Sequence, residues 1–151
     1  MFASTATALR KSGDADMLII DGAPHASAET VEIARAANLL IIPTGLSLDD
    51  LEPAVTLANT LTDQHSIPAD RIAFALCKTG SSIAELEEAR AYLGKTRFTT
   101  LDGAIPQKPA FSRAMDAGLS IIETHYKAPR EQAQQVIQAA IERFERLIQT
   151  A

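Results

Sequence analysis

Short, unbroken apolar runs alternate along the chain with longer stretches of helical periodicity. Runs of this kind, bounded by Gly, Pro or Asp, are typical of strands that are buried on both faces of a parallel sheet. The pattern predicts four such strands, over residues 17–20, 39–42, 72–77 and 99–105. The first ends at Asp21 and Gly22, and the second is stopped by Pro43.

Between these runs, apolar residues recur at intervals of three and four, which predicts amphipathic helices. Asp49 or Asp50 is the expected N-cap of one helix, with Pro53 in its first turn, and Ser82 with Glu85 forms a capping box for the next. The helices are expected at 2–10, 29–37, 50–61, 82–94, 110–117 and 129–150. Strands that alternate with helices indicate βαβ units, so we expect a single α/β domain over residues 1–151, with a parallel sheet covered by helices on both faces.

Composition narrows the class of protein. The 151 residues are 46% hydrophobic and carry 14 Lys and Arg against 19 Asp and Glu, a net charge of −5, which argues against a free-standing basic nucleic-acid module. The single cysteine, Cys77, cannot form an internal disulfide, which favours a reducing compartment. No apolar run approaches the roughly 20 residues that span a membrane. Residues 1–11 also lack the apolar core of a secretory signal. We therefore expect a cytoplasmic location and no membrane partner.

Asp21 is the strongest candidate for a ligand-binding residue, because it directly follows the first predicted strand. Open α/β sheets bind ligands at the carboxyl ends of their strands. A carboxylate at that edge can hold magnesium, which in turn screens nucleotide phosphates. The alternative is that Asp21 only caps the turn before Gly22.

Four elements in succession resemble the ParA/MinD family of deviant Walker ATPases. Asp16, Leu18 to Asp21 and Pro24 fit the family's Walker B strand and switch II loop, and Leu39 to Pro43 with Asp50-Leu51 fits the strand and helix that follow. Further on, IAFALCKT at 72–79 resembles the strand that ends near the adenine. The stretch AIPQKPAFSRAMDAGLSIIE at 104–123 resembles the segment before the family's C-terminal helix. The resemblance runs from about residue 14 to 150.

This resemblance implies a P-loop NTPase-like fold of the SIMIBI/ParA type that uses ATP and Mg²⁺. It also implies plasmid or chromosome partition through nucleotide-dependent dimerisation, non-specific DNA binding and a ParB-type partner. By the same resemblance Asp21 would bind magnesium and Pro24, with His25, would lie in the switch II loop. The resemblance also implies that four residues would lie near the base or ribose of the nucleotide: Lys78, Pro106, Gln107 and Lys108. A solvated lysine at a strand end is the alternative for Lys78.

The chain also departs from the family pattern. Gly22 stands where the family has Thr, and Ala23 replaces the first Pro of the usual pair. Residues 1–151 contain no K-G-G-x-G-K-T loop; Gly94-Lys95-Thr96 follows a predicted helix rather than a strand, which is the wrong context. The switch I aspartate is missing too, so the chain resembles the C-terminal half to two-thirds of such a protein, truncated at its N-terminal side. We expect it alone to bind ATP weakly or not at all and not to hydrolyse it, and we assign no catalytic residue.

Two other classes of function stay open: a degenerate, non-enzymatic interaction module on the same scaffold, and an unrelated α/β regulator that converged on the strand–Asp pattern.

Cys77 is expected to be a core residue, and the three histidines lack metal-ligand spacing. Basic residues gather in the last third of the chain, where ParA proteins contact DNA, but interleaved Glu residues favour a solvated, mixed-charge face. They are Arg113, Lys127, Arg130, Arg143 and Arg146.

A last expectation concerns association. In folds of this type the strand before the Walker A loop lies between the strands expected here at 17–20 and 39–42, and that strand is not in this sequence. The gap could close by direct pairing of the two strands, by a second copy, or by a separate fragment. We expect self-association, because open apolar strand edges promote it.

Overall fold

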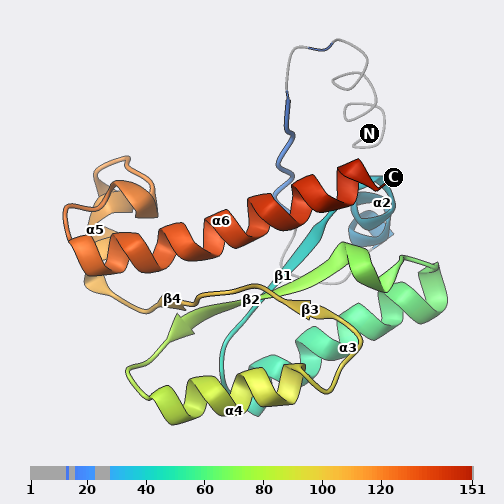
Figure 1. Ribbon diagram of the computed structural model, residues 1–151, viewed down its shortest axis with the longest axis horizontal. Helices are drawn as coiled ribbons and strands as arrows, with labels where there is room; N and C mark the ends of the chain where they lie inside the picture. The colour runs from blue at the N-terminus through green and yellow to red at the C-terminus, as the bar shows by residue number, and fades with distance from the viewer. Residues whose placement is uncertain (1–12, 14–15, 23–27, 151) are drawn as a thin grey trace.

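A computed structural model describes residues 13, 16–22 and 28–150 of the chain. Its strands are all parallel and run in the order β1–β2–β3, with β4 pairing further along the same β2 (Figure 1). They cover β1 (Leu40–Thr44), β2 (Ile72–Thr79), β3 (Thr99–Thr100) and β4 (Ile105–Pro106). The predicted strands at 39–42 and 72–77 are therefore confirmed, and they are direct neighbours in the sheet.

Helices cover both faces of this sheet, as the alternating pattern predicts. In Figure 1, α3 and α4 lie on one side of the strands and α6 crosses the other side. The helices are α2 (Ala28–Ala36), α3 (Leu48–His65), α4 (Ile83–Leu93), α5 (Pro109–Asp116) and α6 (Lys127–Gln149), with 3₁₀ turns η1 (Ala69–Arg71) and η2 (Ile121–Glu123). The helices predicted at 29–37, 110–117 and 129–150 are confirmed within a few residues, and the one predicted at 2–10 lies outside the described residues. The α/β class is thus established.

The core is asymmetric about the sheet. On the α3 and α4 side, large side chains such as Phe74, Leu51 and Leu93 are fully buried together. On the α6 side the sheet presents the small residues Ala73 and Ala75, packed against α6. β2 is buried on both faces, which explains why its sequence is an unbroken apolar run rather than an alternating one.

The start of α3 differs from the prediction. Its N-cap is Ser47, not Asp49 or Asp50, because the Ser47 carbonyl accepts the N–H groups of Asp50 (3.0 Å) and Leu51 (2.9 Å). Pro53 consequently lies inside the helix rather than in its first turn. The N-cap of α4 is Ser82 as predicted, and its hydroxyl accepts the Glu85 N–H at 3.2 Å.

The strand predicted over 99–105 is divided into β3 and β4. Gly103 adopts φ +79° between them, and the register of β2 shifts between Cys77 and Thr79, where Lys78 adopts φ +53°. A β-bulge of this kind lets one strand pair with two short partners at different points. The single strand is therefore wrong, although its two ends both join the sheet.

The strand predicted at 17–20 is also wrong. Residues 16–22 are irregular, and the exposed fractions of Met17, Leu18 and Ile19 are 43%, 46% and 84%. Within the described residues β1 has no strand neighbour other than β2, so the segment does not close the sheet by pairing with β1. An apolar run becomes a strand only when a neighbouring edge supplies hydrogen bonds, and within the described residues this run is paired with no strand.

Candidate ligand site at the carboxyl edge of the sheet

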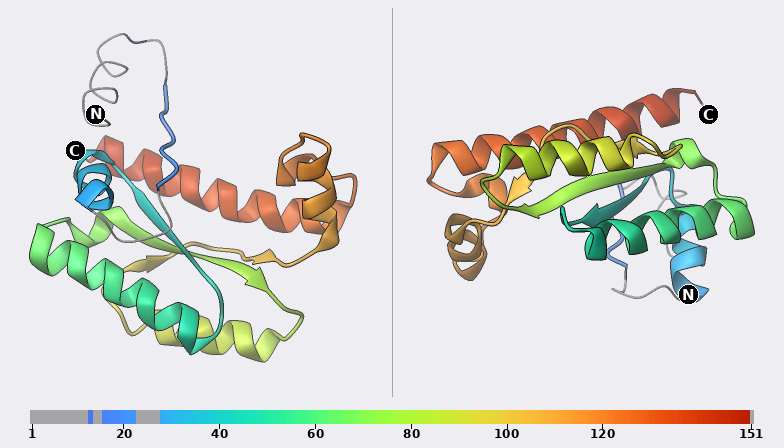
Figure 2. Two further views of the ribbon diagram at one scale, coloured as in Figure 1. Left: turned by 180° about the vertical axis from the view of Figure 1, so that it is seen from behind. Right: turned by 90° about the horizontal axis from the view of Figure 1, so that it is seen from below.

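Because the strands are parallel, β1, β2 and β4 end at one edge of the sheet (Figure 2). Each strand then leads through a short loop into the first turn of a helix: α3, α4 and α5 respectively. The apolar runs of the sequence predict that Asp21, Pro43, Lys78 and Pro106 share this edge, because parallel strands end on one side. Pro43, Lys78 and Pro106 do so. Strand ends followed by helix N-termini are the usual ligand-binding region of open α/β sheets.

The loops after β2 and β4 are joined to each other by a backbone hydrogen bond. The Gln107 N–H donates to the Thr79 carbonyl at 2.9 Å, and Thr79 itself is buried. Lys108 is the N-cap of α5, and its carbonyl accepts the Phe111 N–H at 3.0 Å. The structure therefore brings Lys78, Gln107 and Lys108 to adjacent positions, with both lysines exposed to solvent.

Charge divides this edge into two parts. The first turn of α3 carries Asp49 and Asp50, and the Ser47 hydroxyl donates to the Asp50 carboxylate at 2.9 Å. The first turn of α5, by contrast, contains no acidic residue and follows Lys108. The first turn of α4, after the β2 loop, carries Glu85. Anionic ligands are therefore favoured at the β4 loop, beside Lys108 and Lys78, and disfavoured at the β1 loop. The sequence analysis did not predict this difference in charge between the two helix starts, because it considered Asp49 and Asp50 only as N-cap residues.

Asp21 and Pro24 are not joined to this group by the structure. Asp21 is exposed and follows no strand, so the argument that placed it at a strand end is wrong. Pro24 and His25 lie outside the described residues. In the part of the chain that is described, no group of three or more His, Cys, Asp or Glu residues is arranged to hold a metal ion. The structure therefore adds no such cluster to Asp21, on which the predicted magnesium site rests.

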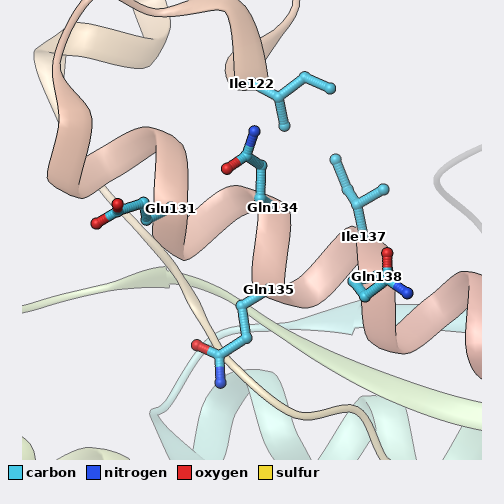
Figure 3. A pocket seen from close by; sticks show the side chains of 6 residues that line it. All are labelled: Ile122, Glu131, Gln134, Gln135, Ile137 and Gln138. Atoms are coloured by element: carbon cyan, nitrogen blue, oxygen red, sulfur yellow. The ribbon is translucent and has the colours of Figure 1, made fainter.

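Two surface depressions can be compared with this edge. One runs along α6 beneath η2, but its side chains do not converge: in Figure 3, Gln134 points toward Ile122 whereas Gln135 points to the opposite side of the helix. A second lies on the outward face of α3, where Asp49 and Glu52 contribute to its lining. Neither depression contains a residue of the predicted site, and the sheet edge remains the best candidate.

Cys77 is partly buried in β2 beside this edge. Burial raises the pKa of its thiol, and the charge of Lys78 only partly opposes this. Since the thiolate is the reactive form, a raised pKa leaves less of it at any given pH. We expect iodoacetamide to alkylate Cys77 more slowly in the folded chain than after denaturation, measured by mass spectrometry at slightly alkaline pH. Equal rates in the two states would contradict this assignment.

Three basic residues of α6 contact nearby oxygen atoms. Lys127 lies 3.8 Å from Glu131, and Arg143 donates to the Asp70 carbonyl at 2.6 Å. Arg146 donates to the carbonyl of Glu142 within the helix at 3.3 Å. These contacts fit the mixed-charge face that the interleaved Glu residues predict, rather than a continuous basic stripe.

Comparison of the sequence with models of protein families and with curated proteins gives no match. None of the helices in the described ranges is both long enough and apolar enough to pass through a lipid bilayer.

Proposed function

We propose that the chain is the C-terminal part of a ParA-like partition module, and that its carboxyl edge faces the base and ribose of ATP. The observation that carries this proposal is the junction between the β2 and β4 loops, where the Gln107 N–H meets the Thr79 carbonyl. The strands at 40–44, 72–79 and 99–106 are parallel neighbours, so their carboxyl ends lie at one edge, as a ligand site at that edge requires.

Each residue of this edge has a role that its chemistry allows. The ammonium groups of Lys78 and Lys108 suit ribose and phosphate oxygens, and the side-chain amide of Gln107 can both donate to and accept from a base edge. Pro106 fixes the backbone just before these residues. Asp21 fits magnesium as a single carboxylate ligand, since this ion commonly keeps several waters and takes phosphate oxygens as further ligands.

Partition activity further requires partners. By resemblance these are a second nucleotide-bound subunit, a ParB-type protein and non-specific DNA. The engaged basic residues of α6 argue for a modest contribution of this helix to DNA binding. A degenerate, non-enzymatic interaction module is the second candidate, and the acidic first turn of α3 favours it, because Asp49 and Asp50 repel phosphate at one end of the same edge.

Titration with millimolar Mg-ATP, followed by amide chemical shifts, tests the proposed nucleotide site. We expect shifts in the loops at 78–82 and 105–109 and, if Asp21 binds the magnesium, at Asp21. Lys108→Ala should weaken the binding by about tenfold, because a charge-assisted contact is lost. Lys95→Ala is the matched control: this exposed lysine follows the C-terminal end of α4, away from the carboxyl edge, so its loss should leave the titration unchanged.

The outcomes separate the two candidates. Shifts that are absent at millimolar ATP, or that Lys95→Ala weakens as much as Lys108→Ala does, contradict the nucleotide site and leave the non-enzymatic module. Release of phosphate by the wild-type chain that is abolished in Asp21→Ala would show a complete ATPase, against our expectation that residues 1–151 do not turn over ATP.

A further inference from the structure

Among the described residues, no strand pairs with the outer edge of β1, and the direction of the backbone groups at this edge follows from the neighbouring strand β2. The Phe74 carbonyl accepts the Leu101 N–H at 2.8 Å, so the polar groups of Phe74 face β3. Successive residues of a strand direct these groups to alternate sides, so those of Ala73 face β1, where Ala73 is in register with Ile41. In parallel pairing Ala73 bonds to the residues that flank its partner. The N–H and C=O of Ile41 therefore point away from the sheet.

By the same alternation, the groups of Pro43 also point away from the sheet. Proline has no N–H, so this position offers an acceptor and no donor. The free edge of β1 is thus able to bind a short strand, centred on Ile41 and bounded by Pro43. Ile41 is itself 39% exposed, and within the described residues no strand covers it on this side.

The same chain contains an apolar segment that is not part of any sheet. Met17, Leu18 and Ile19 are exposed by 43%, 46% and 84%, and the run Met17–Ile20 is close in length to the five-residue β1. Isolated apolar residues on a surface are common, but a consecutive exposed run indicates an interaction site. Within the described residues, the run 17–20 pairs with no strand, and no strand pairs with the outer edge of β1.

We propose that residues 17–20 of one copy pair with the free edge of β1 in a second copy, and that the exchange is reciprocal. Gly22, at the end of the segment, lies against Ile33 of α2, since a Cβ at Gly22 would be 4.0 Å from the Ile33 Cδ1 atom. A second copy can use the exposed residues 17–20 while this contact is kept, whereas pairing with the chain's own β1 requires the segment to move. Reciprocal exchange gives a closed two-fold dimer, the commonest form of homo-oligomer.

Light scattering over a micromolar concentration series, without nucleotide, tests this proposal. We expect a dimer for the wild-type chain and a dissociation constant raised by about tenfold or more in Ile19→Asp, because a charge replaces an apolar contact in the new interface. Ile83→Asp is the matched control. Ile83 is 73% exposed at the start of α4, and it belongs neither to the run 17–20 nor to β1. The control variant should dimerise as the wild type does.

Hydrogen exchange at the Ile41 amide provides a second readout, with protection expected in the dimer and lost in Ile19→Asp. A monomeric wild type overturns the proposal, and so does a dimer that Ile19→Asp leaves intact or that Ile83→Asp disrupts. A monomer whose Ile41 amide is protected shows pairing within the chain, by residues 17–20 or by another segment, and also overturns it. The proposal does not rest on the nucleotide site, because no nucleotide is present in the measurement.

Discussion

Replacing Phe74 by alanine should lower the free energy of unfolding by about 3–5 kcal/mol. Phe74 lies in the middle of β2, has no exposed surface, and packs edge-on against Phe98 with the ring centroids 5.8 Å apart and an interplanar angle of 86°. The substitution removes this aromatic pair and leaves a cavity between the sheet and the helices α3 and α4. Since small domains are stable by only about 5–15 kcal/mol, a large part of the total would be lost.

Urea unfolding followed by circular dichroism measures this effect as a lower midpoint at an unchanged slope. Met115→Ala is the control, because Met115 is 64% exposed on α5 and its truncation leaves no cavity. We expect the control to change the midpoint little. A Phe74→Ala variant that unfolds like the control would show that the core on this face of the sheet is not packed as described.

The success of the sequence prediction at β2 has the same physical origin as this sensitivity. A strand buried on both faces must be apolar at every position, and Ile72–Leu76 meets that requirement. The long helices α3 and α6 were likewise predictable, because a three- and four-residue apolar repeat over many turns has few other interpretations. In these elements local pattern and tertiary burial agree.

The errors arise where structure depends on distant neighbours. Residues 17–20 have the composition of a strand, but their conformation depends on an edge that no local feature specifies. The run 99–105 was divided by Gly103 and by a bulge at Lys78, which is far away in the sequence. The N-cap of α3 was misplaced by a few residues because Ser47 and Asp50 are both good capping residues and the pattern cannot choose between them.

The candidate site shows the same division. Its location followed from topology alone, since the carboxyl ends of parallel strands share an edge, and Lys78, Gln107 and Lys108 are indeed brought together there. The same reasoning placed Asp21 at this edge, and that prediction is wrong because residues 17–20, before Asp21, do not form a strand. If residues 17–20 pair with β1 of a second copy, as proposed above, that strand would be restored, and Asp21 would follow a strand end in the assembled form.

Gly103→Ala should be among the most destabilising substitutions outside the core, with a loss of about 2–4 kcal/mol in the free energy of unfolding. Gly103 has φ +79°, and a Cβ there would lie 3.0 Å from the Gln135 Cγ and 3.1 Å from the Val136 Cγ2 atom of α6. Its carbonyl also accepts Arg90 of α4 at 2.6 Å, so the backbone cannot shift freely. The side chains of Gln135 and Val136 must therefore move by a few tenths of an ångström to admit the new methyl group, and the buried Val136 has little room to do so.

Gly118→Ala separates the two causes of this loss. Gly118 has nearly the same backbone angle, φ +73°, but in the part of the chain that the structure describes no atom beyond its chain neighbours lies within 4 Å of a Cβ added there. It should lose only the cost of the left-handed conformation, about 1–2 kcal/mol. Urea midpoints of the two variants, compared at equal slopes, then give the steric part at Gly103 by difference. Equal losses would mean that α6 does not press on the loop between β3 and β4, and that the closeness of Gln135 and Val136 to Gly103 is relieved without cost.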